Sequence, residues 1–199
     1  MTSRVTADVT IGPGDWDDRD LRGETFQRVR FVDLDLMELA DEGAVFEECT
    51  FSDVRFNVSA HESAAFLTCA FRGCSFFDAS FTGCKLTGSS FSGCTFGLLK
   101  VDGGDWSFTS LARADLRGST FDGVRLREAD LSGAKLEGAA LRGCDLTGAA
   151  LRGADLSSCD LRGSDLSTLD PQTVTLDKAV VDPDQAAVIV TAMGLRVLP

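Results

Sequence analysis

The chain has 199 residues, a length that suits a single domain. Hydrophobic residues make up 44% of it, enough for a buried core, so disorder along the whole chain is not expected. The 31 acidic residues outnumber the 19 basic ones, and the net charge of −12 argues against direct nucleic-acid binding, which requires basic residues.

The N-terminus, MTSRVTADVT, has no apolar segment of the kind that forms a secretory signal. Polar residues interrupt every apolar run, so no membrane span is expected either. We interpret residues 1–10 as an N-terminal cap. Residues 1–60 carry 14 acids and 6 bases, a net charge of −8, so most of the acidity lies near this end.

From Ile11 to Leu176, every fifth residue is a central position, and 31 of these 34 positions are hydrophobic. The exceptions are Asp41, His61 and Pro171. Phe dominates the first part and Leu the last. A period of five fits neither a helix nor a strand, and it indicates a solenoid in which each repeat buries its central residue against its neighbours. We assign the solenoid to residues 11–178.

Asp41 and His61 are twenty residues apart. If four repeats form one coil, they stack in adjacent coils. The favoured interpretation is a local bulge near residues 36–43 that turns both side chains outward; the alternative is a buried ion pair or a site. His61 is the only histidine, so no histidine-based metal cluster is available, and we expect no cofactor, no metal and no enzymatic activity.

Each cysteine lies two places before a central residue, where other repeats carry Ala or Ser. Packing explains this placement better than a disulfide framework does. Seven reduced thiols favour a cytoplasmic location. The positions are Cys49, Cys69, Cys74, Cys84, Cys94, Cys144 and Cys159.

Four apolar residues occupy positions that the pattern exposes: Leu67, Phe77, Leu98 and Phe108. Phe77 and Leu98 are expected in adjacent coils on one face. These residues are candidates for a contact surface, with scattered surface hydrophobes as the favoured alternative. Six aspartates precede central leucines and are candidates for an acidic contact surface, although they could equally hydrogen-bond the turn backbone. These are Asp115, Asp130, Asp145, Asp155, Asp160 and Asp165.

After the repeat, the sequence predicts a helix that begins with Asp182 as its N-cap, Pro183 as its first residue and Gln185 three residues after the cap. Gly194 is expected to end this helix. We expect residues 179–199 to hold a short α-helix and an apolar tail that cap the solenoid and join two copies into a homodimer. The interface candidates are Ile189, Val190, Met193, Leu195, Val197 and Leu198.

Units such as Ala114-Asp115-Leu116-Arg117-Gly118 and Ala79-Ser80-Phe81-Thr82-Gly83 resemble those of the pentapeptide repeat proteins. The resemblance implies an all-β fold, a right-handed quadrilateral β-helix with twenty residues per coil and a C-terminal α-helix. About eight coils at ~4.8 Å each would form a rod of roughly 40 Å.

The segments Val181-Asp182, Asp184-Gln185-Ala186 and Gly194-Leu195 look like the tail of the family's fluoroquinolone-resistance branch, which comprises the MfpA and Qnr proteins. The five-residue register runs without interruption from Ile11 to Leu176, which is more similar to the loop-free MfpA type than to the Qnr proteins, which carry projecting loops. This resemblance implies a DNA-mimicking homodimer that binds DNA gyrase (GyrA/GyrB), with topoisomerase IV as a second target. It would modulate supercoiling and protect against fluoroquinolones or a natural topoisomerase poison, as self-immunity or as regulation of topology. The alternative is a repeat scaffold for an unrelated protein partner.

Overall fold

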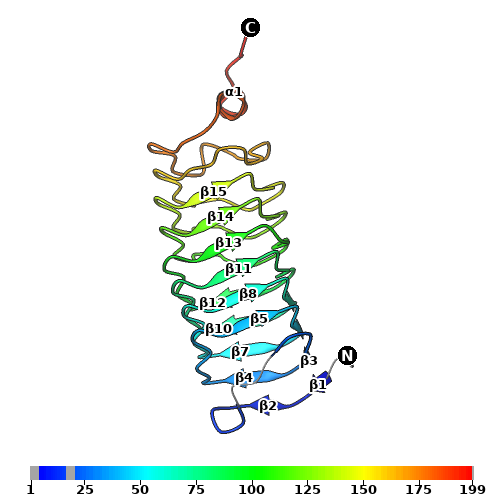
Figure 1. Ribbon diagram of the computed structural model, residues 1–199. Helices are drawn as coiled ribbons and strands as arrows, with labels where there is room; N and C mark the ends of the chain where they lie inside the picture. Colours follow the sequence, from blue (N-terminus) through cyan, green and yellow to red (C-terminus); the bar gives the residue numbers. More distant parts are fainter. Residues whose placement is uncertain (1–4, 17–20, 199) are drawn as a thin grey trace.

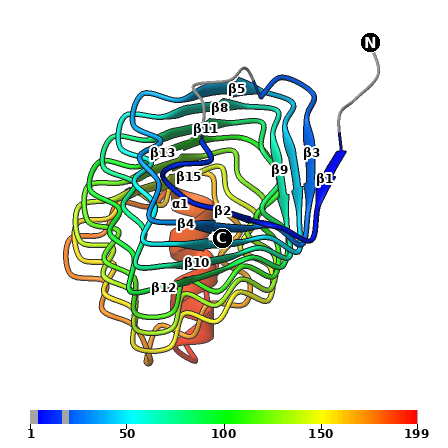
Figure 2. The same ribbon diagram turned by 90° about the horizontal axis from the view of Figure 1, so that it is seen from below.

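The computed structural model describes residues 5–16 and 21–198, and in it the chain winds into a right-handed quadrilateral β-helix (Figures 1 and 2). Each extended segment pairs in parallel with the segment twenty residues later, as Phe26 does with Phe46. Four segments therefore complete one square coil, as expected. Residues 1–4 of the expected cap lie outside the described residues, and pairing has already begun at Val5, which faces Thr25.

Three of the four faces carry named strands. The first face has β1 (Val5–Ala7), β3 (Thr25–Gln27), β6 (Val45–Glu47) and β9 (Ala65–Leu67). The second has β2 (Thr10–Ile11), β4 (Arg30–Val32), β7 (Thr50–Ser52), β10 (Ala70–Arg72) and β12 (Ser90–Ser92).

The third face is formed by isolated parallel bridges, such as the one from Asp35 to Arg55. The fourth face is the longest sheet, with six strands: β5 (Ala40–Glu42), β8 (Ala60–Glu62), β11 (Ser80–Thr82), β13 (Lys100–Asp102), β14 (Thr120–Asp122) and β15 (Ala140–Arg142). We call it the six-stranded face.

At most corners between faces, the residue two places after the central residue is in the left-handed region. Glycine adopts this conformation without a steric cost, which explains its recurrence there. Gly104, one place beyond such a corner, is needed for a further reason: its φ is +86°, and an added Cβ would lie 2.1 Å from the carbonyl oxygen of Cys84. No other residue fits that backbone position.

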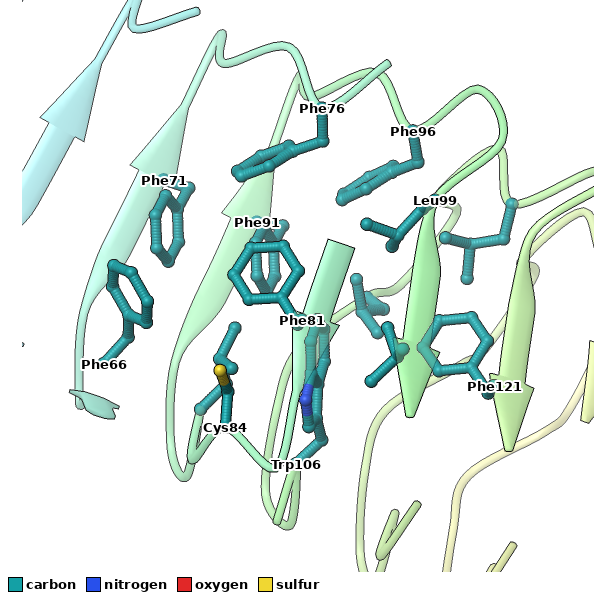
Figure 3. Packing of buried hydrophobic residues seen from close by; sticks show 14 of the residues in the cluster. Phe66, Phe71, Phe76, Phe81, Cys84, Phe91, Phe96, Leu99, Trp106 and Phe121 are labelled. Carbon is teal, nitrogen blue, oxygen red and sulfur yellow. The ribbon is translucent and has the colours of Figure 1, made fainter. Parts of the chain in front are cut away.

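The central side chains point inward and stack in columns along the solenoid axis (Figure 3). Phe rings twenty residues apart lie nearly parallel: the Phe51–Phe71 and Phe71–Phe91 centroids are 4.8 and 4.7 Å apart. This spacing equals the separation of neighbouring strands. A buried Leu or Phe contributes about 1.5–3 kcal/mol, so the columns are the main source of stability.

The solenoid ends in α1 (Pro183–Ala192), which lies beyond the last coil and across it (Figures 1 and 2). Asp182 and Gln185 form a capping box. The buried Gln185 side chain also donates to the carbonyls of Leu161 (2.6 Å) and Ser164 (2.7 Å). The helix thus satisfies backbone groups of the terminal coil that no further strand pairs with.

Candidate interaction surface

The six predicted aspartates do not form one surface. Asp115 and Asp155 share the third face, with Lys135 between them. The other four lie on the remaining three faces, because their positions within the twenty-residue coil differ: Asp145 and Asp165 on the first, Asp130 on the second and Asp160 on the six-stranded face.

These aspartates hydrogen-bond the turn that follows them, which was the structural alternative. The carboxylate of each accepts the backbone N–H two residues later, as in Asp130 with Ser132 (3.0 Å) and Asp155 with Ser157 (3.0 Å). Such Asx contacts explain why aspartate recurs at this place in the repeat.

Three of the six are also paired with arginine. Asp115 pairs with Arg117, Asp145 with Arg127 at 3.4 Å, and Asp160 with both Arg142 and Arg162. Hydrogen bonds from Arg162 hold the pKa of Asp160 well below its usual range, and those from Arg117 lower the pKa of Asp115. These carboxylates are ionised, but much of their charge is compensated locally.

A different set of acids lines one column of the six-stranded face. Glu42 and Glu62 are register partners, and so are Asp102 and Asp122, with Thr82 between the two pairs. The acidic column ends at Arg142, the next register partner of Asp122. All four side chains are exposed. Across residues 5–16 and 21–198, none of the four has an ion-pair partner.

Sequence reasoning missed this acidic column, although its signal was present. The four acids follow a central residue at twenty-residue intervals, broken only at Thr82. Stacked like charges repel one another across neighbouring strands. The column therefore costs stability and presents uncompensated negative charge to solvent.

The expected bulge at Asp41 and His61 is wrong, because both side chains point into the core and are no more than 5% exposed. His61 Nδ1 hydrogen-bonds Asp41, and Ser59 Oγ lies 3.0 Å from His61 Nε2. The His61 ring stacks on Phe81, with centroids 4.6 Å apart. The imidazole thus replaces one Phe of the column, and its hydrogen bonds make the burial tolerable.

Asp41, His61 and Ser59 are linked in the order of a catalytic triad, yet each is buried and the ring is enclosed by Phe56, Phe66 and Phe81. A nucleophile must contact its substrate, and the Ser59 side chain faces the core. The second Asp41 oxygen, Oδ1, is buried without a hydrogen-bond partner. We assign the cluster a structural role.

The cysteines are free thiols, as predicted, and all but the partly buried Cys94 are buried. Six of the seven, all but Cys159, have Sγ in contact with the carbonyl oxygen 23 residues earlier, as Cys69 does with Phe46 at 3.3 Å. Ser89 makes the same contact with Phe66 at 2.7 Å, so a small side chain with a donor suits this position. Burial raises the pKa of Cys144 to about 11 and that of Cys159 to about 12.

Of the four apolar candidates, Leu67 is only partly exposed. The other three are about half exposed, but they lie on two different corners. Phe77 and Leu98 share the corner between the third face and the six-stranded face, where Met37 and Val58 are also exposed. Phe108 is ten residues, or half a coil, beyond Leu98 and so lies on the diagonally opposite corner. Sequence reasoning missed Met37 and Val58.

The C-terminal candidates are uncovered in the single chain. Met193, Leu195, Val197 and Leu198 are exposed, whereas Ile189 packs partly against the core and Val190 is half-buried. In the part of the chain that the structure describes, there is no cluster of three or more metal-ligating side chains. Nor does that part contain a helix long and apolar enough to cross a bilayer.

The chain is a β-solenoid: its cross-section is square, its central side chains point inward, and its segments pair in parallel every twenty residues. Its candidate interaction residues lie on the outer faces. The sequence model described as pentapeptide repeats matches residues 69–96, 109–148 and 129–167. The matched segments of the chain, between residues 69 and 167, are repeats of the pentapeptide repeat family.

Solved structures provide similarities of fold only. A trypsin-treated form of QnrB1, a plasmid-mediated fluoroquinolone resistance protein, is 22% identical over 100% of both chains, with a TM-score of 0.47. HetL from the cyanobacterium Nostoc sp. strain PCC 7120, a pentapeptide repeat protein involved in heterocyst differentiation regulation, is 20% identical. That similarity covers 81% of this chain and 86% of HetL, with a TM-score of 0.32. No curated protein sequence matches the chain.

Proposed function

We propose that this protein is a DNA-mimicking ligand of DNA gyrase, with topoisomerase IV as a second target. In this proposal it belongs to the family's fluoroquinolone-resistance branch, modulates supercoiling and protects the enzyme against quinolones or a natural topoisomerase poison. The observation that carries the proposal is the column of free carboxylates Glu42, Glu62, Asp102 and Asp122.

The column supports mimicry because its carboxylates recur at one or two strand spacings and have no ion-pair partner within residues 5–16 and 21–198. Neighbouring strands lie ~4.8 Å apart, which is comparable with the ~3.4 Å of axial rise per phosphate in one DNA strand. A protein surface that binds DNA is basic, and a straight acidic column offers it a matching potential. The net charge of −12 is about half that of the ~24 phosphates on 40 Å of duplex, and condensed counterions also reduce the effective charge of DNA.

The apolar tail supports the second part of the proposal, a homodimer joined at the C-terminal ends. Leu195, Val197 and Leu198 are more than half exposed, and Met193 precedes them at the helix end. An exposed apolar cluster of this kind is typical of an interface. With Ile189 and Val190, these residues would bury one another across a two-fold axis and double the length of the acidic rod.

A supercoiling assay with purified bacterial gyrase tests the proposal. The wild-type chain should inhibit supercoiling at micromolar concentration, and inhibition should weaken as salt rises. Asp102→Asn with Asp122→Asn should weaken it about three- to tenfold, because two unpaired charges leave the column. The matched control is Asp33→Asn with Asp53→Asn, which removes the same charge from the diagonally opposite corner.

Equal inhibition by both double variants would contradict the assignment of this face. An absence of inhibition by the wild type, with no protection from a quinolone, would favour the scaffold alternative. The dimer is tested separately by sedimentation: Leu195→Ser with Val197→Ser should give monomers, whereas Phe108→Asn should leave the dimer intact. A wild-type chain that sediments as a monomer would refute the tail-to-tail arrangement.

A further inference from the structure

A ridge of apolar side chains runs along the corner between the third face and the six-stranded face. Met37, Val58, Phe77 and Leu98 come from four successive coils, and their exposed fractions are 45%, 46%, 52% and 50%. Strand stacking separates successive members by ~4.8 Å, so the ridge is about 14 Å long.

Two members of the ridge have backbone conformations that are unfavourable for large side chains. Val58 and Leu98 have φ values of 59° and 58°, in the left-handed region. A bulky side chain there costs about 1–2 kcal/mol, and a β-branched one is a true outlier. The same corner carries Gly118 and Gly138 in later coils. The chain therefore places large apolar groups on its surface where glycine would cost less, which is typical of a functional position.

Two members of the ridge have glycine at the equivalent position of the next coil. An added Cβ at Gly97 would lie 3.1 Å from the Phe77 ring, and one at Gly118 would lie 3.9 Å from Leu98. The equivalent positions after Met37 and Val58 carry Asn57 and Asp78 instead.

On the six-stranded face, a strip of small side chains separates the ridge from the acidic column. Ala40, Ala60 and Ser80 are register partners in β5, β8 and β11. The strip ends where Lys100 pairs with Asp78 at 2.6 Å. Shallow hollows lie at its two ends, one of ≈ 330 Å³ beside Met37 and Ala40, and one of ≈ 380 Å³ beside Ser80 and Thr82.

We propose that the ridge and the strip receive a cationic amphipathic α-helix of a partner protein. Apolar residues on one side of a helix recur every ~5.4 Å along its axis, close to the ~4.8 Å repeat of the ridge. The partner's lysines and arginines would face Glu42 and Glu62 across the strip, and Glu38 at the corner. Across the described ranges, 5–16 and 21–198, these three carboxylates have no ion-pair partner. The charge match selects a basic helix over an acidic or neutral one.

This docking surface does not depend on gyrase binding, and its test uses no topoisomerase. The probe is a fluorescent synthetic peptide of about 18 residues with leucines on one helical face and lysines on the other. A second peptide has the same composition in scrambled order. Binding to the full-length chain is measured by anisotropy at low and at physiological salt.

We expect the amphipathic peptide to bind and the scrambled one to bind at least about tenfold more weakly. Val58→Asn with Phe77→Ser and Leu98→Asn should weaken binding by about tenfold or more. Because Asn tolerates the left-handed region, this variant should fold at least as well there. Phe108→Asn, the matched control, removes an equally exposed group with the same positive φ from the opposite corner and should leave binding unchanged. Glu42→Gln with Glu62→Gln should reduce both affinity and its salt dependence.

Several results would overturn the proposal. One is no binding by the wild type up to about 1 mM peptide. Equal binding of the scrambled peptide would indicate attraction by charge alone. Self-association of the free chain that disappears in the ridge variant but persists in the tail variant would mean that a second copy covers the ridge.

Discussion

The two halves of the solenoid build the same square coil from different corners. Up to Arg113 most left-handed corner positions carry residues other than glycine, including Val58, Leu98 and Phe108. From Gly118 onward glycine dominates, with Glu128, Ser158 and Lys178 as the exceptions. The N-terminal half thus accepts backbone strain, whereas the C-terminal half avoids it.

Paired acids occur in both halves: Asp8, Asp35 and Asp78 pair with basic residues in the N-terminal half, as Asp115, Asp145 and Asp160 do in the C-terminal half. The acidic column is less evenly divided, because Glu42, Glu62 and Asp102 belong to the N-terminal half and only Asp122 to the other. The buried polar cluster around His61 is likewise in the N-terminal half. Within one fold, the N-terminal half therefore carries most of the exposed acidic column and the buried polar cluster. The C-terminal half is more regular and carries the terminal helix.

The largest expected effect is on the buried pair of the N-terminal half. Asp41→Ala should lower the free energy of unfolding by about 3–5 kcal/mol, because it leaves the His61 ring without its buried partner. Asp41→Leu with Ser59→Ala and His61→Phe should restore an apolar column like that of the other faces and match or exceed the wild type. Urea unfolding followed by circular dichroism measures both.

If the triple variant were as unstable as Asp41→Ala, the hydrogen bonds of the cluster would stabilise the fold by more than the cost of burying its polar groups. If Asp41→Ala had no effect, the pair would not be buried in solution as it is here.

A smaller effect is expected at alkaline pH in the C-terminal half. Burial raises the pKa of Cys144 and Cys159 above the ~8.5 of an unfolded thiol. Their contribution to stability is complete below the unfolded pKa and is lost as pH rises, because the unfolded chain then releases protons that the folded chain keeps. Each thiol should lower stability by ~1.4 kcal/mol per pH unit in that window.

Cys144→Ala with Cys159→Ala should flatten the decline in stability between about pH 9 and pH 11. Ser119→Ala, a buried hydroxyl at the inward position that Cys159 occupies two coils later, removes no titrating thiol and should leave the slope unchanged. A slope that is identical in all three proteins would show that these thiols ionise as easily in the folded state as in the unfolded one.

The smallest effect concerns the corners themselves. Val58→Asn should raise stability by about 1 kcal/mol, because asparagine tolerates the left-handed region better than valine. Gly138→Ala should lower it by about 1–2 kcal/mol through backbone strain alone, since an added Cβ there meets nothing within 4 Å. Thermal unfolding of the two variants reports opposite shifts. Shifts of the same sign would show that strain does not distinguish the halves.

Much of the fold could be predicted because one physical requirement repeats in every unit. A residue such as Phe76 or Leu146 must be buried, and a fixed period of five places it inward each time. The helix start was equally readable, since the capping contacts of Asp182 and Gln185 are local.

The misses came from contacts between coils. Asp41 and His61 were expected to turn outward because each alone would be costly to bury, and only their mutual hydrogen bond removes that cost. Of the ridge, only Phe77 and Leu98 were predicted. Met37 and Val58 were missed because the members alternate between the first and second positions after the central residue and so do not recur every twenty residues. The arginine partner of Asp145 comes from a neighbouring coil and depends on side-chain geometry that the repeat does not specify.

Because the square coils stack in register, the length of the solenoid can change without any change in its cross-section. Removing or adding twenty residues between two corners shortens or lengthens the column by one strand spacing, ~4.8 Å, and leaves every remaining residue on its original face. A lineage can therefore adjust the reach of such a protein in fixed steps while its end structure and its surface motifs stay intact. A change of any other size rotates everything beyond it to a different side.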